Sequence, residues 1–144
     1  MNFAEISKAR GQVIDNFVQI ETLIASIISN FYVGRQNPYS FMFSLQVLYD
    51  ENCSFGMKRN ILKKILELIQ LERNKKKEDG SNFEKLYKLN KVRNLFAHCG
   101  PDVFIAIEGQ GKRITPSPQD PSTPIDFGGE LQIFMKLFPE VLLW

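Results

Sequence analysis

The sequence predicts a mainly α-helical protein: an up-and-down bundle of four to five helices, with a small β-hairpin after the fourth helix. Apolar residues recur every three to four positions in several long stretches, which is the period of amphipathic helices. Polar segments rich in turn-forming residues separate these stretches. With 144 residues, of which 44% are hydrophobic and 24% charged, the chain has the size and composition of one ordinary globular domain, residues 1–144.

The first predicted helix is long and covers residues 5–32. The apolar side chains that follow its helical period are Val13, Phe17, Ile20, Ile24, Ile27 and Phe31. Gly34 and Pro38 end this helix, and a shorter second helix is expected over residues 39–49. The side chains expected to face inward from the second helix are Phe41, Leu45 and Leu48. Its phenylalanine content leaves a strand open as the alternative.

The third helix is expected over residues 55–73, with Ser54 as the N-cap that accepts a backbone hydrogen bond. Its expected apolar face consists of Met57, Ile61, Ile65, Leu68 and Ile69. A polar loop over residues 74–81 follows, and Asn82 is expected to cap the fourth helix. The core-facing side chains of the fourth helix are expected to be Leu86, Leu89, Val92 and Phe96.

After Pro101 the character of the sequence changes. Residues 103–107 are apolar and mostly β-branched, and a glycine-rich turn with a return segment completes a predicted β-hairpin over residues 103–115. The hairpin and a proline-rich extended linker are expected to fill about residues 102–125.

A final helix is expected over about residues 128–143, with Pro139 stopping or kinking it. The apolar face of this helix is expected to be Leu131, Phe134, Met135 and Phe138. The last four residues, 141–144, are strongly apolar and are expected to be buried against the bundle or a partner chain.

The net charge of +2 is small, but the charge is unevenly distributed. Residues 58–93 carry 12 of the 18 basic side chains and 5 of the 16 acidic ones, a local charge of +7 that leaves −5 for the rest. This basic segment leads into the histidine motif described below, which indicates a polyanion as a partner. The alternative is a solvated lysine-rich surface, because residues 75–77 also fit a simple loop.

Several classes of protein are not indicated. Cys53 and Cys99 have no metal-ligand or redox spacing, and the chain has one histidine, so no metal and no cofactor is expected. Both cysteines are expected to be reduced thiols in a cytoplasmic protein. The sequence has no signal-peptide pattern and no apolar stretch of membrane-spanning length, so no membrane partner is expected.

The stretch from Arg93 to His98 reads Arg-Asn-Leu-Phe-Ala-His and ends near the expected C-terminus of the fourth helix, because a Gly-Pro pair follows shortly after it. The helix dipole at that position favours the imidazolium form by roughly 0.3–1 kcal/mol. With about 100° per residue, Asn90, Asn94 and His98 lie on one stripe, and the long Arg93 side chain can lean toward it.

Arginine binds phosphate through two hydrogen bonds, and an imidazole can move a proton on an adjacent hydroxyl. Together they predict phosphodiester chemistry without a metal, with Arg93 and His98 as candidate catalytic residues and Asn94 in support. The candidate RNA contacts are Lys58, Asn90 and Lys91.

The motif resembles the Arg-x(4–6)-His signature of HEPN domains, in its common Arg-Asn-x-x-x-His form. Ser54, Phe55 and Lys58 are similar to a Ser-Phe-x-x-Lys element that precedes the signature helix in that family, and the resemblance covers roughly residues 10–100. It implies a metal-independent ribonuclease that acts as a homodimer on RNA. It also implies a toxin or defence role, with a possible antitoxin or nucleotidyltransferase as a partner.

The resemblance further implies that an acidic residue on an early helix supports the motif, and Glu21 is the position that matches. From the residue itself, an exposed position at the edge of the first helix is the alternative.

Cleavage of RNA by its own 2′-hydroxyl needs a base for that proton and an acid for the leaving oxygen. One chain has one histidine, so a two-fold dimer that apposes the motif helices is expected to supply both groups.

Two other hypotheses stay open. The first is a HEPN-fold module without catalysis that binds RNA, a nucleotide or a partner protein. The second is an unrelated helical-bundle interaction protein, in which His98 is a helix C-terminal cation and Arg93 a surface ion-pair partner. A dimer with both His98 rings in one basic cleft favours the ribonuclease, whereas a buried or outward-facing His98 favours the interaction protein.

Overall fold

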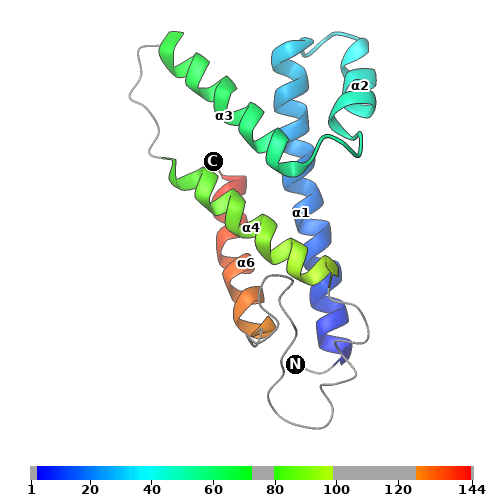
Figure 1. Ribbon diagram of the computed structural model, residues 1–144, viewed down its shortest axis with the longest axis vertical. Coiled ribbons are helices and arrows are strands. Elements are labelled where there is room, and N and C mark those ends of the chain that lie inside the picture. Colours follow the sequence, from blue (N-terminus) through cyan, green and yellow to red (C-terminus); the bar gives the residue numbers. More distant parts are fainter. Residues whose placement is uncertain (1–2, 73–79, 99–125, 144) are drawn as a thin grey trace. The chain divides into compact units, whose positions relative to one another are not determined.

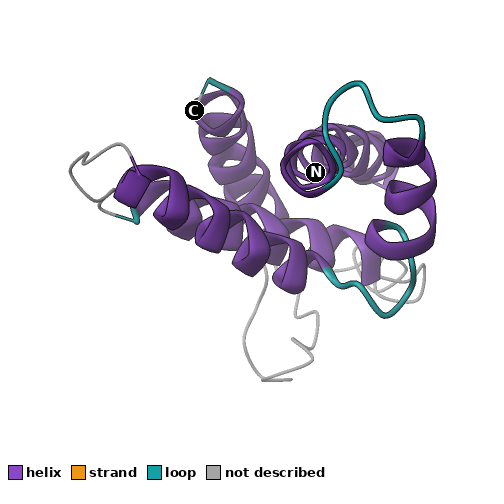
Figure 2. Cartoon of the chain, turned by 90° about the horizontal axis from the view of Figure 1, so that it is seen from above, coloured by secondary structure: helices purple, strands orange, loops and turns teal. Residues whose placement is uncertain are grey.

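The computed structural model describes residues 3–72, 80–98 and 126–143, and the elements in those residues are helices (Figure 1). They are α1 (Phe3–Tyr32), α2 (Tyr39–Phe43), the π-helical turn η1 (Ser44–Leu48), α3 (Phe55–Glu72), α4 (Ser81–His98) and α6 (Phe127–Leu142). The prediction of a mainly helical protein is therefore confirmed. No strand occurs in the described residues (Figure 2), and the hairpin and linker predicted for residues 102–125 lie outside them.

The chain groups into two compact units. Unit 1 takes residues 1–17 and 87–144, and unit 2 takes residues 18–86. The helices α1 and α4 each contribute one part to unit 1 and the other part to unit 2.

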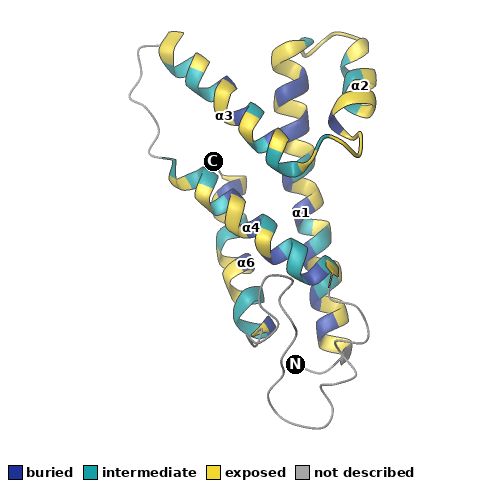
Figure 3. Ribbon diagram, viewed as in Figure 1, coloured by how far each residue is buried: buried dark blue, intermediate teal, exposed yellow. Residues whose placement is uncertain are grey.

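The core of unit 1 is built from the first half of α1, the second half of α4, and α6. Buried and exposed side chains alternate along these helices with the helical period (Figure 3). The Phe96 ring of α4 meets the Phe127 ring of α6 edge to face, with centroids 5.4 Å apart. The predicted core-facing stripe of α4 is confirmed, since all four of its members are buried: Leu86 in unit 2, and Leu89, Val92 and Phe96 in unit 1.

The helix α6 begins at an N-cap, where the Asp126 carboxylate accepts a hydrogen bond from the Gly129 N–H at 3.0 Å. It continues through Pro139 to Leu142, in agreement with the predicted extent of about 128–143, so of the two predicted effects of this proline the stop is excluded. A proline near the end of a helix removes one backbone donor, and packing of the apolar face offsets that loss. On this face Phe134 is buried, but Met135 is exposed, contrary to prediction.

The apolar end of the chain is buried only in part. Val141 is buried, whereas Leu143 is 88% exposed, so Leu143 is not buried against the bundle, and burial against a partner chain, the other expectation for this end, stays a prediction. The helix can turn one face toward the core, and the side chains next to that face remain in solvent.

In unit 2 the second half of α1 buries Ile20, Ile24 and Ile28. Ile27 and Phe31 are exposed, contrary to the predicted face. The neighbouring Ser29 explains the difference: it is buried, its hydroxyl donates to the Ser40 carbonyl at 3.1 Å, and it lies 2.6 Å from the Ser40 hydroxyl. This contact with α2 selects the side of α1 that carries residues 28 and 29.

The predicted second helix is split between α2 and η1. The Tyr49 N–H donates to the Ser44 carbonyl five residues earlier at 2.9 Å, as in a π-helical turn. This wider turn changes which residues share a face. Leu48 is buried as predicted, but Phe41 and Leu45 are exposed, which corrects the predicted inward face.

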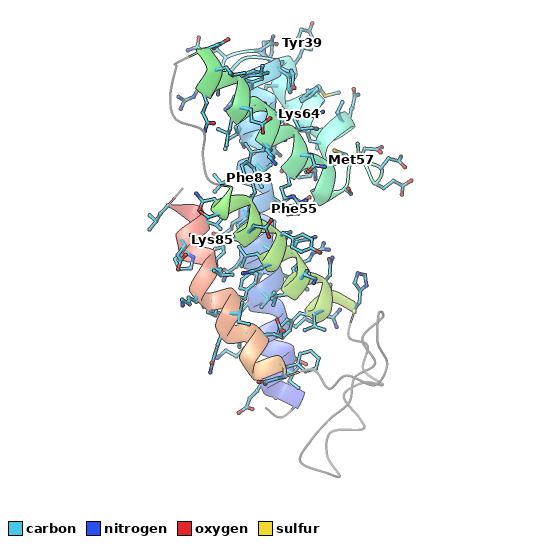
Figure 4. All side chains as sticks on the ribbon, turned by 60° about the vertical axis from the view of Figure 1, so that its left-hand side comes forward. Tyr39, Phe55, Met57, Lys64, Phe83 and Lys85 are labelled. Carbon is cyan, nitrogen blue, oxygen red and sulfur yellow. The ribbon has the colours of Figure 1, made fainter. Side chains whose placement is uncertain are left out.

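The start of α3 confirms the predicted cap, because the Ser54 hydroxyl accepts a hydrogen bond from the Met57 N–H at 3.3 Å. Of the predicted apolar face, Ile65 is buried as expected and Ile61 and Ile69 are half-buried, whereas Met57 and Leu68 are exposed. The buried residues of the helix are Lys58, Leu62 and Ile65. Met57 is 51% exposed, and Figure 4 shows it together with Tyr39 at the surface of unit 2.

The start of α4 also differs from the prediction. Gly80, in the left-handed region at φ 78°, precedes Ser81, and the Glu84 N–H donates to the Gly80 carbonyl at 3.2 Å. Asn82 therefore lies inside the helix and is not its cap. Glycine suits this position because it has no Cβ to clash at positive φ.

A charged pair lies in the core of unit 2. The Lys58 ammonium donates to the Glu21 carboxylate at 2.5 Å, with the two side chains 3% and 22% exposed. The same ammonium lies 5.1 Å from the centroid of the Tyr49 ring. The ion pair joins α1 to α3, and the contact of the Tyr49 ring with Lys58 joins the residue after η1 to α3.

We predict that removing the two members of this pair has unequal effects. Glu21→Gln leaves a buried ammonium without a carboxylate, and we expect it to lower the free energy of unfolding by about 3 kcal/mol. Lys58→Met leaves a carboxylate that is 22% exposed and can be hydrated, so we expect a loss of about 1 kcal/mol or less. Urea unfolding followed by circular dichroism measures both values.

Asp15→Asn removes an exposed carboxylate from α1 and serves as the control, with an expected change below about 0.5 kcal/mol. The double variant Glu21→Gln/Lys58→Met is expected to be more stable than Glu21→Gln alone. A greater loss in Lys58→Met than in Glu21→Gln contradicts this account of the pair.

Candidate functional site

The motif lies on the last two turns of α4, in unit 1. His98 is the last residue of the helix and is exposed, while Asn90 and Asn94 are half-buried. The three side chains follow one another at four-residue spacing, so they share the predicted stripe. An exposed imidazole fits the interaction-protein hypothesis, and it is also what a site shared between two copies of the chain requires.

Arg93 is held in place by two contacts within unit 1. Its guanidinium lies 5.6 Å from the centroid of the buried Phe17 ring of α1, and its Nη1 donates to the Asn94 side-chain oxygen at 2.8 Å. The predicted lean of Arg93 toward the stripe is therefore confirmed. Neither the Phe17 ring nor the Asn94 side chain carries a charge. These two contacts therefore leave the positive charge of Arg93 uncompensated.

Arg10 is a residue that sequence reasoning missed. Its Nη2 donates to the Ala97 carbonyl at 3.1 Å, one residue before His98. The last carbonyls of a helix have no partner inside the helix, and a cationic donor is well suited to them. Arg10 thus caps α4 and brings a second guanidinium to the end of the helix that carries the imidazole.

The contacts of Arg10 and Phe17 fix how α1 and α4 cross in unit 1. Phe17 meets Arg93, and Arg10, seven residues earlier on α1, meets Ala97, four residues later on α4. The two helices therefore run antiparallel there. Residues seven apart lie on the same side of a helix, so the spacing of Arg10 and Phe17 indicates that they share a face of α1. The spacing does not indicate that α4 is the helix that packs on that face.

The charged side chains of α4 next to the motif are of one sign. The stretch from Tyr87 to His98 contains Lys88, Lys91 and Arg93 but no aspartate or glutamate. Lys91 is exposed, and its ammonium lies 5.4 Å from the centroid of the Tyr87 ring. With Arg10 added from α1, this end of unit 1 is suited to an anionic ligand.

Glu21 and Lys58, two further predicted site residues, belong to a different unit from the motif. Both belong to unit 2, where they form an ion pair with each other. The burial of Lys58 argues against its predicted contact with RNA, because a phosphate needs an accessible ammonium. Glu21 has its own partner in Lys58, and the geometry of unit 2 does not link it to the motif.

The described residues contain no group of three or more histidine, cysteine, aspartate or glutamate side chains that could hold a metal ion. Cys53 is a free thiol, and Cys99 lies outside the described residues. Among the described helices, none is both long and apolar enough to cross a membrane. In unit 2, hydrogen bonds from the Asn52 backbone and side chain lower the pKa of Asp50 in the loop before α3.

Comparison of the chain with protein-family models, with curated proteins and with solved structures gave no match. What the site can do must therefore be inferred from its own geometry and chemistry.

Proposed function

We propose that this protein is a metal-independent endoribonuclease of the HEPN type, with a site that two copies of the chain form together. One observation carries the proposal: the Arg93 guanidinium is bound to Asn94 on the stripe that ends in the exposed His98. The Arg93 guanidinium is suited to binding a phosphate of the substrate, and the His98 imidazole is suited to moving a proton on an adjacent hydroxyl.

The reaction is transfer of a phosphodiester to the neighbouring 2′-hydroxyl. A base removes the proton from the 2′-oxygen, that oxygen forms a bond to phosphorus, and the bond from phosphorus to the 5′-oxygen breaks. An acid protonates the 5′-oxygen as it leaves, so a 2′,3′-cyclic phosphate and a 5′-hydroxyl result. Since each chain has a single histidine, the two copies of His98 take the roles of base and acid.

The arginines act on charge and position. Arg93 stabilises the negative charge that grows on the non-bridging oxygens in the transition state. Asn94 holds Arg93 in place through its side-chain oxygen. Arg10 orders the last turn of α4, which carries His98, by binding the Ala97 carbonyl. Asn90 and Lys91 contact the RNA on either side of the cleaved bond.

The wider parts of the proposal follow the family resemblance. They are a homodimer, a cytoplasmic location, and a toxin or defence role with an antitoxin or nucleotidyltransferase as a partner. The up-and-down bundle stays a prediction that the antiparallel crossing of α1 and α4 in unit 1 supports. The competing proposal is a HEPN-fold binding module without catalysis. The first experiment below distinguishes it from the ribonuclease.

We predict that the purified protein cleaves RNA in the presence of EDTA and leaves 2′,3′-cyclic phosphate ends. His98→Ala and Arg93→Ala are each expected to lower the cleavage rate by about 100-fold or more, because each removes a proton-transfer or charge-stabilising group. Gel electrophoresis of end-labelled RNA, with mass spectrometry of the products, measures both the rate and the end chemistry.

Lys136→Ala removes an exposed lysine of α6 in unit 1 that the mechanism does not use, so it is the control and should cleave at the wild-type rate. If the folded wild-type protein binds RNA but does not cleave it, the ribonuclease proposal is wrong and the binding module takes its place. Cleavage that both motif variants retain also contradicts the proposal, because the activity then comes from another source.

A second prediction concerns the need for two copies. Cleavage per chain is expected to fall when the protein is diluted below the dissociation constant of the dimer. Adding an excess of the His98→Ala variant is expected to lower cleavage by the wild type, because mixed dimers contain a single histidine. Analytical ultracentrifugation over the same concentration range gives the fraction of dimer. A rate proportional to wild-type concentration, unaffected by the variant, is evidence for a site within one chain.

A further inference from the structure

The helix α3 carries a second, largely apolar face that is not packed in the core of unit 2. Five residues on it recur at alternating spacings of four and three, and we call them the α3 seam: Met57, Ile61, Lys64, Leu68 and Leu71. With about 100° per residue, they fall within about 80° of one another around the helix. Met57, Leu68 and Leu71 are 51%, 50% and 74% exposed, and Ile61 is half-buried.

The spacing of the α3 seam is that of the contact positions in helices that pair along their length. Alternating steps of four and three residues place one side chain on the same line every 3.5 residues on average, as at the a and d positions of a coiled coil. From Met57 to Leu71 the seam rises about 21 Å, or about four helical turns.

Packing inside unit 2 uses a different face of the same helix. The buried residues of α3 are Lys58, Leu62 and Ile65. They lie about 100° around the helix from the centre of the seam. The helix therefore has one apolar face that is used within the unit and a neighbouring one that is exposed. Exposed apolar patches of this kind mark sites of interaction with other molecules.

Lys64 is the central member of the seam, and it is exposed (Figure 4). Within the residues that the structure describes, its ammonium forms no ion pair, and this includes Glu67, three residues later. When an apolar surface closes over such a charge, water is excluded and the charge needs an opposite one beside it. The seam is therefore complementary to apolar side chains that surround a carboxylate.

A second copy of α3 does not supply that carboxylate. Lys64 is the middle one of the five positions, so antiparallel two-fold pairing of two seams places Lys64 against Lys64, and parallel pairing does the same. Two ammonium groups in an apolar contact repel each other. A lysine at one contact position thus disfavours pairing with a copy and favours a partner of opposite charge.

We propose that the α3 seam is a docking site for an amphipathic α-helix of a different protein. Its apolar side chains pack on Met57, Leu68 and Leu71, and a glutamate or aspartate among them pairs with Lys64. The seam lies in unit 2 and contains no residue of the Arg93–His98 motif, so the inference does not depend on the proposed ribonuclease activity.

The test uses the full chain and two synthetic helical peptides as probes. Each peptide has about three heptads with leucine at the contact positions, except for the central one, which is glutamate in one peptide and lysine in the other. Fluorescence anisotropy of the fluorescein-labelled peptides gives both dissociation constants. We expect the glutamate peptide to bind about tenfold or more tightly than the lysine peptide, because the lysine peptide opposes like charges.

Matched variants assign the binding to the seam. Lys64→Glu is expected to reverse the preference, so that the lysine peptide binds more tightly. Lys63→Glu makes the same change of charge at an exposed lysine about 100° away around the helix, and it should keep the wild-type preference. Leu71→Asp is expected to weaken binding of the glutamate peptide by about tenfold or more. Circular dichroism verifies that each variant is folded.

Equal affinity of the wild type for the two peptides overturns the inference, as does the absence of binding to either. Unchanged affinity in folded Leu71→Asp overturns it too, because the peptide then binds elsewhere. These dissociation constants are measured without RNA, so failure of the proposed function, seen as absent cleavage, is distinct from each of these outcomes.

Two further measurements address other occupants of the seam. If Leu71→Asp lowers the self-association of the wild-type chain in analytical ultracentrifugation, the seam is an interface between copies. If it lowers cosedimentation with vesicles of phosphatidylcholine and phosphatidylserine, the seam contacts a lipid surface. Either result overturns the proposal of a helical protein partner, whereas unchanged self-association and no vesicle binding support it.

Discussion

The packing of α1 against the last turns of α4 is the constraint on which the candidate site depends. A helix can bury one face, and on α4 the buried face ends in Val92 and Phe96. Burying these two side chains leaves the opposite stripe, with Asn94 and His98, toward solvent. The exposure of the single histidine is thus a consequence of where the apolar residues lie.

The same packing holds the positive groups together. Like charges repel, yet unit 1 holds Lys91 and Arg93 in a stretch of α4 that has no acidic residue, and Arg10 of α1 binds the end of that stretch. Each has a neutral partner that stabilises its position: the Ala97 carbonyl for Arg10, the Asn94 amide and Phe17 ring for Arg93, and the Tyr87 ring for Lys91. Neutral partners orient a cation and leave its net charge in place for an anionic ligand. A carboxylate partner cancels that charge.

Unit 2 uses polar contacts in a different way. Lys58 meets Glu21 in its core, and Ser29 meets Ser40 between α1 and α2. These contacts are directional, so they select one rotation of each helix among several that bury similar apolar area. This selection is why the observed faces of α1 and α3 differ from those that hydrophobic spacing predicts, and why Ile27 and Met57 are exposed.

The amino-acid sequence is enough to locate α1, α3, α4 and α6, because the spacing of apolar residues and the Ser54 cap are local properties of the chain. It also determined the buried stripe of α4 and the alignment of Asn90, Asn94 and His98, since both follow from the helical period. Packing between the elements sets the pairing of Lys58 with Glu21, the π-helical turn that exposes Leu45, and the approach of Arg10 to Ala97. These features join residues far apart in sequence or depend on which of two equivalent faces packs, and no local pattern carries that information.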